Sequence, residues 1–321
     1  MIYLLFALGF VLLLYGADLL VQNASALARR FHLPDIVIGL TIVSFGTSAP
    51  ELIISLTATI EGVTDLAIGN ILGSNIFNVF VIIGITAAIT PIRVLPSTTW
   101  KEVPFSLLAA VLLAVCSLDY LIEGRGQNDL GRIDGLVFLS FFIIFLIYSF
   151  QLSRSTSGTG RVELPESKGK PLYLILLFLL AGVAMLYLGG RWIVGGADSV
   201  GRLLGLSENV IGLVIVAVAT SLPELITSII AARRGSPDMA IGNAIGSNIF
   251  NIFLILGVSA LFRPLPFGEA QMADAGMTLF SHLVLFAVIL LGRKAHTISR
   301  IEGVLMLLIY VAYMSWAVVV R

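Results

Sequence analysis

Two short stretches of this chain set a proline and a glutamate within long apolar runs. They read TSAPE at residues 47–51 and TSLPE at residues 220–224. On a helix, the threonine and the serine precede the glutamate by four and three positions, so two hydroxyls and a carboxylate share one face. A charged side chain at the centre of a membrane-spanning helix costs about 3 kcal/mol. Because the chain incurs this cost twice, we expect Glu51 and Glu224 to have a bound partner that offsets it.

A second pair of stretches supplies amides and further hydroxyls. They read AIGNILGSNIFN at residues 67–78 and AIGNAIGSNIFN at residues 240–251. Beside the main polar positions lie Asn75 and Asn248, which either bind an ion or hydrogen-bond an interrupted helix. The main polar residues recur at every fourth position and so share one helix face; they are Asn70, Ser74, Asn78, Asn243, Ser247 and Asn251.

These groups are nearly all oxygen ligands. Pro50 and Pro223 add to them, because a proline donates no backbone hydrogen bond and leaves the carbonyl four residues earlier as a free acceptor. The stretches contain no His or Cys, which Zn2+ and copper favour. Ca2+ takes about six to eight oxygens, and Na+ is also a hard cation. The sequence therefore predicts a cation site in which Ca2+ between Glu51 and Glu224 neutralises both carboxylates.

The two pairs of stretches belong to one internal repeat. Residues 39–87 align with residues 212–260 at a constant offset of 173 without a gap, and 28 of the 49 positions are identical. The apolar runs place the copies five membrane crossings apart, which is an odd number, so the copies cross the membrane in opposite directions. Many transporters place a binding site at the bilayer midplane between such inverted repeats.

The composition is that of an all-α integral membrane protein. Hydrophobic residues make up 58% of the chain and charged residues 12%, and the mean hydropathy is +1.03; a soluble domain has about 25% charged residues. Runs of this length are typical of membrane-spanning helices. We expect ten transmembrane helices, at 2–28, 35–60, 66–89, 103–121, 133–150, 171–200, 207–232, 238–261, 273–291 and 301–320.

The expected architecture is two inverted-topology five-helix repeats, residues 1–150 and 171–321, joined by a polar cytoplasmic linker at 151–170. The loops after the odd-numbered spans hold 13 of the 19 basic residues. Because basic loops stay in the cytoplasm, both termini are expected to be extracytoplasmic. A net charge of zero gives no indication of a nucleic-acid partner, and no obligatory protein partner or cofactor is evident. A prokaryotic inner membrane suits a chain without targeting segments.

The paired motifs GTSAPE with GNILGSNIFN and ATSLPE with GNAIGSNIFN, together with the ten-helix pattern and the length, resemble the cation/calcium antiporter superfamily, specifically the prokaryotic sodium/calcium exchangers. The resemblance implies exchange of Ca2+ for Na+ at four central ion sites. It also implies that the first and sixth spans slide across the other eight. Carried over position by position, it implies backbone-carbonyl ligands from Ser44 and Ala217, and side-chain ligands from Glu51, Glu224, Thr47, Ser48, Thr220, Ser221, Ser74, Asn78, Ser247 and Asn251.

Two departures from related subfamilies bear on the ions used. Potassium-dependent relatives carry an aspartate, tied to K+ transport, where this chain has Asn251, so the resemblance favours K+-independent exchange. Proton/calcium exchangers typically carry a glutamate where this chain has Gly73 and Gly246, which disfavours proton exchange. An H+/Ca2+ antiporter that uses the same two glutamates remains the alternative.

Other classes of protein fit less well. A passive channel needs a continuous pore, which a midplane site between inverted repeats disfavours. A membrane-embedded enzyme is also disfavoured, because the chain has no HExxH or GxSxG motif, so we expect no enzymatic activity. Asp65 and Asp238 are expected to be helix N-caps, and His282, within a span, is expected to be a packed or hydrogen-bonded residue and not a ligand.

Overall fold

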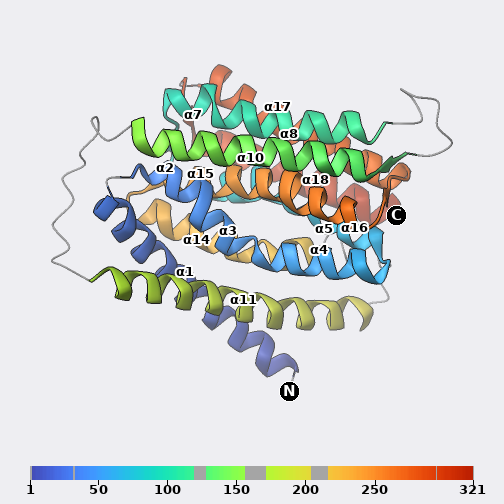
Figure 1. The fold of residues 1–321 in the computed structure, drawn as a ribbon, viewed down its shortest axis with the longest axis horizontal. Helices are drawn as coiled ribbons and strands as arrows, with labels where there is room; N and C mark the ends of the chain where they lie inside the picture. Colours follow the sequence, from blue (N-terminus) through green and yellow to red (C-terminus); the bar gives the residue numbers. More distant parts are fainter. Residues whose placement is uncertain are drawn as a thin grey trace.

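The computed structural model describes residues 2–31, 33–118, 128–155, 171–203, 216–293 and 295–320, and this part of the chain is almost entirely helical (Figure 1). The first half contains α1 (Ile2–Phe31), α2 (Asp35–Ile38), η1 (Gly39–Val43), α3 (Ser44–Thr47), α4 (Ala49–Glu61), α5 (Thr64–Phe77), η2 (Asn78–Ile83), α6 (Gly84–Ile89), α7 (Pro96–Trp100), α8 (Glu102–Cys116) and α10 (Arg132–Ser155). The second half contains α11 (Leu172–Leu203), α13 (Ala217–Thr220), α14 (Leu222–Arg233), α15 (Pro237–Ile249), η4 (Phe250–Leu256), α16 (Gly257–Phe262), α17 (Glu269–Leu291) and α18 (Arg300–Val320).

Eight helices in the described residues are long and apolar enough to cross a membrane, and a bent pair of helices, Asp35–Thr47 with Ala49–Glu61, makes a ninth candidate. The expected seventh span, 207–232, lies partly outside the described residues, which resume at 216. The number ten therefore stays a prediction. Several observed helix ends differ from the expected boundaries: α8 ends at Cys116, α17 begins at Glu269, and α10 continues to Ser155. The chain is therefore still helical where the linker at 151–170 was expected to begin.

Both TSxPE stretches interrupt their helices, as their prolines predict. The first break falls at Ser48, whose ψ of 7° ends α3, and the helix axis bends there by 48°. The second break falls at Ser221, whose ψ is 2°. Pro50 and Pro223 each lie in the first turn of the helix that follows, where a missing amide hydrogen costs little. The two glutamates consequently lie in the first turns of α4 and α14.

Asp65 and Asp238 are not the helix N-caps that the sequence predicted. The residue that precedes α5 is Val63, and the residue that precedes α15 is Ser236, so both aspartates lie one position inside the first turn. An acidic side chain there still interacts favourably with the helix dipole. Asp65 also accepts a hydrogen bond of 3.1 Å from Gln271 of α17.

Two π-helical segments follow the amide-rich helices. Segment η2 begins at Asn78, and η4 begins one residue before Asn251. A π-helical turn widens the backbone and is frequent at functional sites. Both asparagines thus lie where an α-helix changes to a wider one, and both are 1% exposed.

The helices α1 and α11 form a separate layer along one side of the bundle, at the lower edge of the view in Figure 1. Glycines bring the two helices into close contact. A Cβ atom added to Gly16 would lie 3.0 Å from the carbonyl oxygen of Gly182, and one added to Gly189 would lie 2.7 Å from that of Gly9. Small residues at a membrane-helix interface permit such close packing. The pair therefore packs as one unit against the rest of the protein.

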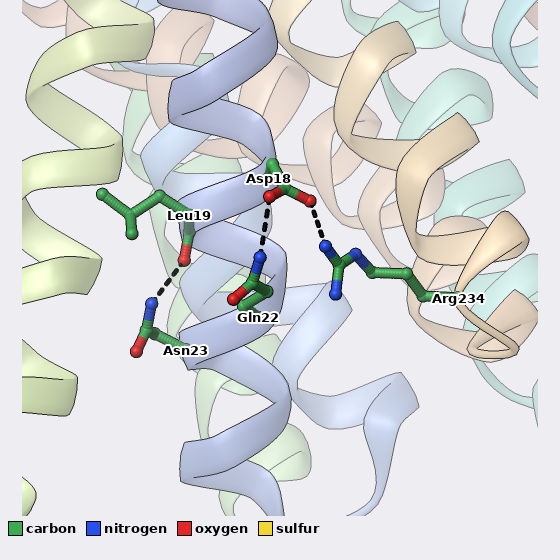
Figure 2. Close-up of polar contacts among 5 residues, drawn as sticks. All are labelled: Asp18, Leu19, Gln22, Asn23 and Arg234. Carbon is green, nitrogen blue, oxygen red and sulfur yellow. Dashed lines mark hydrogen bonds and ion pairs between the residues drawn. The ribbon is translucent and has the colours of Figure 1, made fainter. Parts of the chain in front are cut away.

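One ion pair links this layer to the bundle. Asp18 of α1 forms an ion pair with Arg234, which follows α14, and accepts a hydrogen bond of 2.7 Å from Gln22 of its own helix (Figure 2). The side chains of the pair are 39% and 44% exposed, so solvent weakens their attraction.

We expect Asp18→Asn and Arg234→Gln to lower the free energy of unfolding by similar small amounts. An exposed pair of this kind contributes about 0.5 kcal/mol, and the double variant should be no less stable than either single one. Thermal unfolding of the purified protein in detergent tests this, with Gln22→Ala as the control that leaves the ion pair in place. Additive losses would contradict direct coupling.

A second close approach lies in the bundle, where α15 crosses η1 and α3. A Cβ atom added to Gly242 would lie 2.8 Å from the carbonyl oxygen of Ile36, and one added to Gly246 would lie 2.8 Å from that of Leu40. The four-residue spacing of these two glycines puts both on one face of α15. For Gly69 and Gly73, the matching stretch of the other copy lies mostly outside the described residues.

We expect Gly246→Ala to destabilise the protein by about 1–3 kcal/mol, because the added methyl group must displace a backbone. Gly276→Ala in α17 is the matched control, since a Cβ atom there meets nothing within 4 Å. Melting temperatures of the two variants in detergent test the difference. Equal melting temperatures would contradict the tight crossing.

Short strands connect loops of the two halves. β1 (Ile92–Arg93) pairs antiparallel with β4 (Thr297–Ile298), and β2 (Asp129–Leu130) pairs antiparallel with β3 (Leu265–Pro266). No strand was predicted from the sequence. These two-residue strands satisfy backbone groups at the ends of the helices and join the halves at two places.

Candidate cation site

The two glutamates lie in the interior of the bundle, each 1% exposed. Each accepts a hydrogen bond from the serine that precedes the other glutamate by three positions. Ser48 donates to Glu224 Oε1 at 2.9 Å, and Ser221 donates to Glu51 Oε1 at 3.2 Å. The two interrupted helices therefore meet face to face, as the inverted repeat predicted.

A second symmetric set of contacts surrounds this pair. Thr47 donates to Asn243 Oδ1 at 3.2 Å, and Thr220 donates to Asn70 Oδ1 at 3.1 Å. The amide nitrogens donate in turn to serines four positions after the glutamates, Asn70 to Ser55 and Asn243 to Ser228, both at 3.0 Å. In each of these two asparagines, both the amide oxygen and the amide nitrogen have a hydrogen-bond partner. The contacts therefore support a structural role for Asn70 and Asn243.

The repeat is not symmetric at every position. Ser247 Oγ lies 3.0 Å from Ser48 Oγ and donates to Glu224 Oε1 at 3.4 Å, whereas its counterpart Ser74 has no hydrogen-bond partner among the described residues. Ser44 donates to the backbone carbonyl of Asn243 at 3.0 Å. Its counterpart is Ala217, which has no hydroxyl to do the same.

Several buried oxygens at this centre have no hydrogen-bond partner in the described part of the chain. A buried acceptor without a partner is unfavourable and indicates that a further group belongs beside it. No described residue forms an ion pair with either glutamate, so within the described part of the chain their charge has no counter-charge. The oxygens are Glu51 Oε2, Glu224 Oε2, Ser74 Oγ, Asn78 Oδ1 and Asn251 Oδ1.

The chemistry of this donor set fits a hard cation. Carboxylate, hydroxyl and amide oxygens are the ligands of Ca2+ and similar ions. No group of three or more His, Cys, Asp or Glu that could hold a metal is found among the described residues. Two carboxylates with neutral oxygens can therefore bind a divalent ion, but with fewer charges than a tight calcium site supplies.

All twelve residues expected to be ligands lie within the described residues and are at most 3% exposed. Polar contacts across the two repeats involve Ser44, Thr47, Ser48, Glu51, Thr220, Ser221, Glu224 and Ser247. Asn78 takes part through its amide nitrogen, and Ser74 and Asn251 have unpartnered oxygens. Their roles as ligands stay predictions.

The two serines behind the site were not predicted from the sequence. Ser55 and Ser228 lie one helical turn after the glutamates, a spacing that was visible in both copies of the repeat. His282 was expected to be packed or hydrogen-bonded and not a ligand; it is 1% exposed and hydrogen-bonds Asn248 at 3.2 Å. Nothing in the sequence placed α17 beside α15.

Comparison with known proteins gives consistent results. The family model described as "Sodium/calcium exchanger protein" matches residues 1–151 and 174–319. The chain is 37% identical over 315 residues to the putative antiporter CaxA of Alkalimonas amylolytica, with 95% of each chain covered. It is 32% identical to the sodium/calcium exchanger MaX1 of Methanosarcina acetivorans, with 97% of each covered.

A solved structure of a sodium-calcium exchanger is also similar to this chain. The structure of the sodium-calcium exchanger NCX_Mj soaked with Na+ and Sr2+ superposes with a TM-score of 0.81 at 33% identity, and covers 98% of this chain and 99% of that one. The inner membrane protein YrbG of Escherichia coli is 36% identical, with 97% of this chain and 96% of YrbG covered. Sequence and structure comparisons thus point to the same family over nearly the whole chain.

Proposed function

The chain belongs to the sodium/calcium exchanger protein family, and on that premise we propose that it is a secondary antiporter that exchanges Ca2+ for Na+ across a membrane without K+. Ca2+ and Na+ are its substrates. It is a transporter and not an enzyme, and it uses no cofactor. Its relatives are named antiporters and exchangers, which supports the class of activity.

The observation that carries the proposal is the buried, unpaired charge of Glu51 and Glu224. Both carboxylates have an Oε2 atom without a hydrogen-bond partner in the described residues, and unpartnered neutral oxygens lie on the adjoining helices. One Ca2+ or two Na+ would neutralise the pair. A Ca2+ together with a full set of Na+ would leave excess positive charge in a dry site, so the ions exclude one another. Mutual exclusion favours exchange and not cotransport.

The arrangement of helices supports alternating access. The α1 and α11 layer packs across the breaks in the two central helices: Gly190 of α11 faces both Pro50 and Pro223. A layer held together by close glycine contacts can slide as one body over the site and open it to either side in turn. Repeats that cross the membrane in opposite directions provide the two equivalent end states.

The placement in the membrane follows from charge and from similarity. The relative from Escherichia coli is named an inner membrane protein, and we assign this chain to the corresponding prokaryotic membrane. The basic loops after odd-numbered spans place the linker in the cytoplasm and both termini outside it. This orientation is tested by adding a cysteine at either terminus of the protein and treating intact cells with a membrane-impermeant thiol label; both cysteines should be labelled.

The test of the proposed function is transport by the purified protein in Na+-loaded liposomes. We expect 45Ca2+ uptake on dilution into Na+-free medium, at the same rate whether K+ or choline replaces Na+. Uptake that requires an imposed pH gradient and ignores the Na+ gradient would establish proton exchange instead. Ca2+ flux that needs no counter-ion would establish a channel.

A further inference from the structure

A buried hydrogen-bond chain connects His282 to Asn78, one of the expected ligands. His282 Nε2 lies 3.2 Å from the Asn248 amide nitrogen, and Asn78 Nδ2 donates to Asn248 Oδ1 at 3.0 Å. The three residues come from α17, α15 and η2, and each is 1% exposed. We propose that His282 is a positioning residue that turns the Asn78 amide so that its oxygen faces the cation. This inference rests on the proposed function.

The donors and acceptors of this hydrogen-bond chain can be assigned from a backbone carbonyl at its end. His282 Nδ1 lies 2.8 Å from the carbonyl oxygen of Thr278. A carbonyl can only accept, so Nδ1 carries the hydrogen and donates it. The other partners of His282 are Ser281, Ser106 and Asn248, all uncharged, and nothing among them would offset a buried positive charge. The imidazole is therefore neutral, and its Nε2 can only accept.

The remaining orientations follow from that tautomer. An acceptor at Nε2 requires that Asn248 present its amide nitrogen to His282, which turns Asn248 Oδ1 toward Asn78. That oxygen in turn requires a donor, so Asn78 presents its own amide nitrogen. Asn78 Oδ1 must then point away from Asn248, and it has no hydrogen-bond partner among the described residues. An amide with its nitrogen held and its oxygen left over is oriented to bind a cation.

The other repeat lacks this device. Asn75, the counterpart of Asn248, donates to the backbone carbonyl of Ile71 at 2.7 Å. Asn251, the counterpart of Asn78, has no partner for either amide atom in the described residues. The same residue type is thus held in one copy and not in the other, so the two asparagines contribute unequally to ion binding.

The test measures equilibrium 45Ca2+ binding in Na+-free detergent solution beside Na+-driven uptake in liposomes. Partners that orient a ligand typically change metal affinity by about tenfold when they are removed. We expect His282→Leu to weaken Ca2+ binding about tenfold. His282→Gln keeps an acceptor for Asn248 and should retain most of the affinity. Ser106→Ala is the matched control, because Ser106 contacts the same Nε2 atom at 3.0 Å but does not lead to Asn78.

The decisive comparison uses a chain without the Asn78 amide. In an Asn78→Ala background His282 has nothing to orient, so adding His282→Leu should cause no further loss. An equal loss in both backgrounds would show that His282 only packs, and would overturn the proposal. Asn248→Ala interrupts the hydrogen-bond chain one step nearer the site and must give the same tenfold loss of Ca2+ affinity. This variant tests the proposal if His282→Leu does not fold. Unchanged affinity with normal exchange overturns this inference alone, whereas a native protein that neither binds nor exchanges Ca2+ overturns the proposed function with it.

Discussion

Replacing either Glu51 or Glu224 by Gln is expected to abolish Na+-driven Ca2+ uptake. Each substitution leaves a single buried carboxylate opposite a divalent ion, so one positive charge would have to enter the dry site without a counter-charge. Removing one member of a buried charge pair costs about 3–5 kcal/mol, which corresponds to at least about a hundredfold loss of affinity. The measurements are 45Ca2+ binding to the purified variants and initial rates of uptake in liposomes.

The variants should still fold, because an amide oxygen at position 51 can accept the hydrogen bond that Ser221 now donates. Glu102→Gln is the matched control. Glu102 is also 1% exposed, but it lies on α8 and accepts a hydrogen bond from Tyr148 outside the candidate site. Uptake that survives Glu51→Gln, or that is lost equally in Glu102→Gln, would refute our account of the two glutamates.

Much of this site could be predicted because its motifs occur in both copies of the sequence repeat. TSxPE and GSNIFN each occur twice at one fixed offset, which identifies the helices that must meet. A single buried glutamate without a partner would be unfavourable, so the two copies are expected to face each other. The two prolines mark the breaks, and four-residue spacing places hydroxyl and carboxylate on one face. The hydrogen bonds from Ser48 to Glu224 and from Ser221 to Glu51 show that the two TSxPE stretches meet.

The asymmetric features could not be predicted, because they depend on helices outside the repeated segment. The position of His282 behind Asn248 requires that α17 pack against α8 and α5, and α8 against α15; no periodicity in the sequence specifies those contacts. The π-helical segments at Asn78 and near Asn251 are also invisible, since apolar residues fill both α and π turns equally well. The paired two-residue strands depend on loop contacts between the halves.

Asn251→Asp is expected to make Ca2+ uptake depend on K+. Asn251 is 1% exposed, and neither of its amide atoms has a hydrogen-bond partner in the described residues. In the native site one Ca2+ balances two carboxylates. A third carboxylate would leave one negative charge uncompensated in a low-dielectric interior, and a monovalent cation bound with Ca2+ would remove it.

We therefore expect the rate of uptake by this variant to rise at least about fivefold when K+ replaces choline, a typical coupling between two bound ligands, while the native protein responds equally to both media. Asn251→Ser is the control, because it changes the same position without adding charge and should stay indifferent to K+. A variant that takes up Ca2+ equally fast in choline would contradict the prediction, since the added carboxylate would then be balanced without K+.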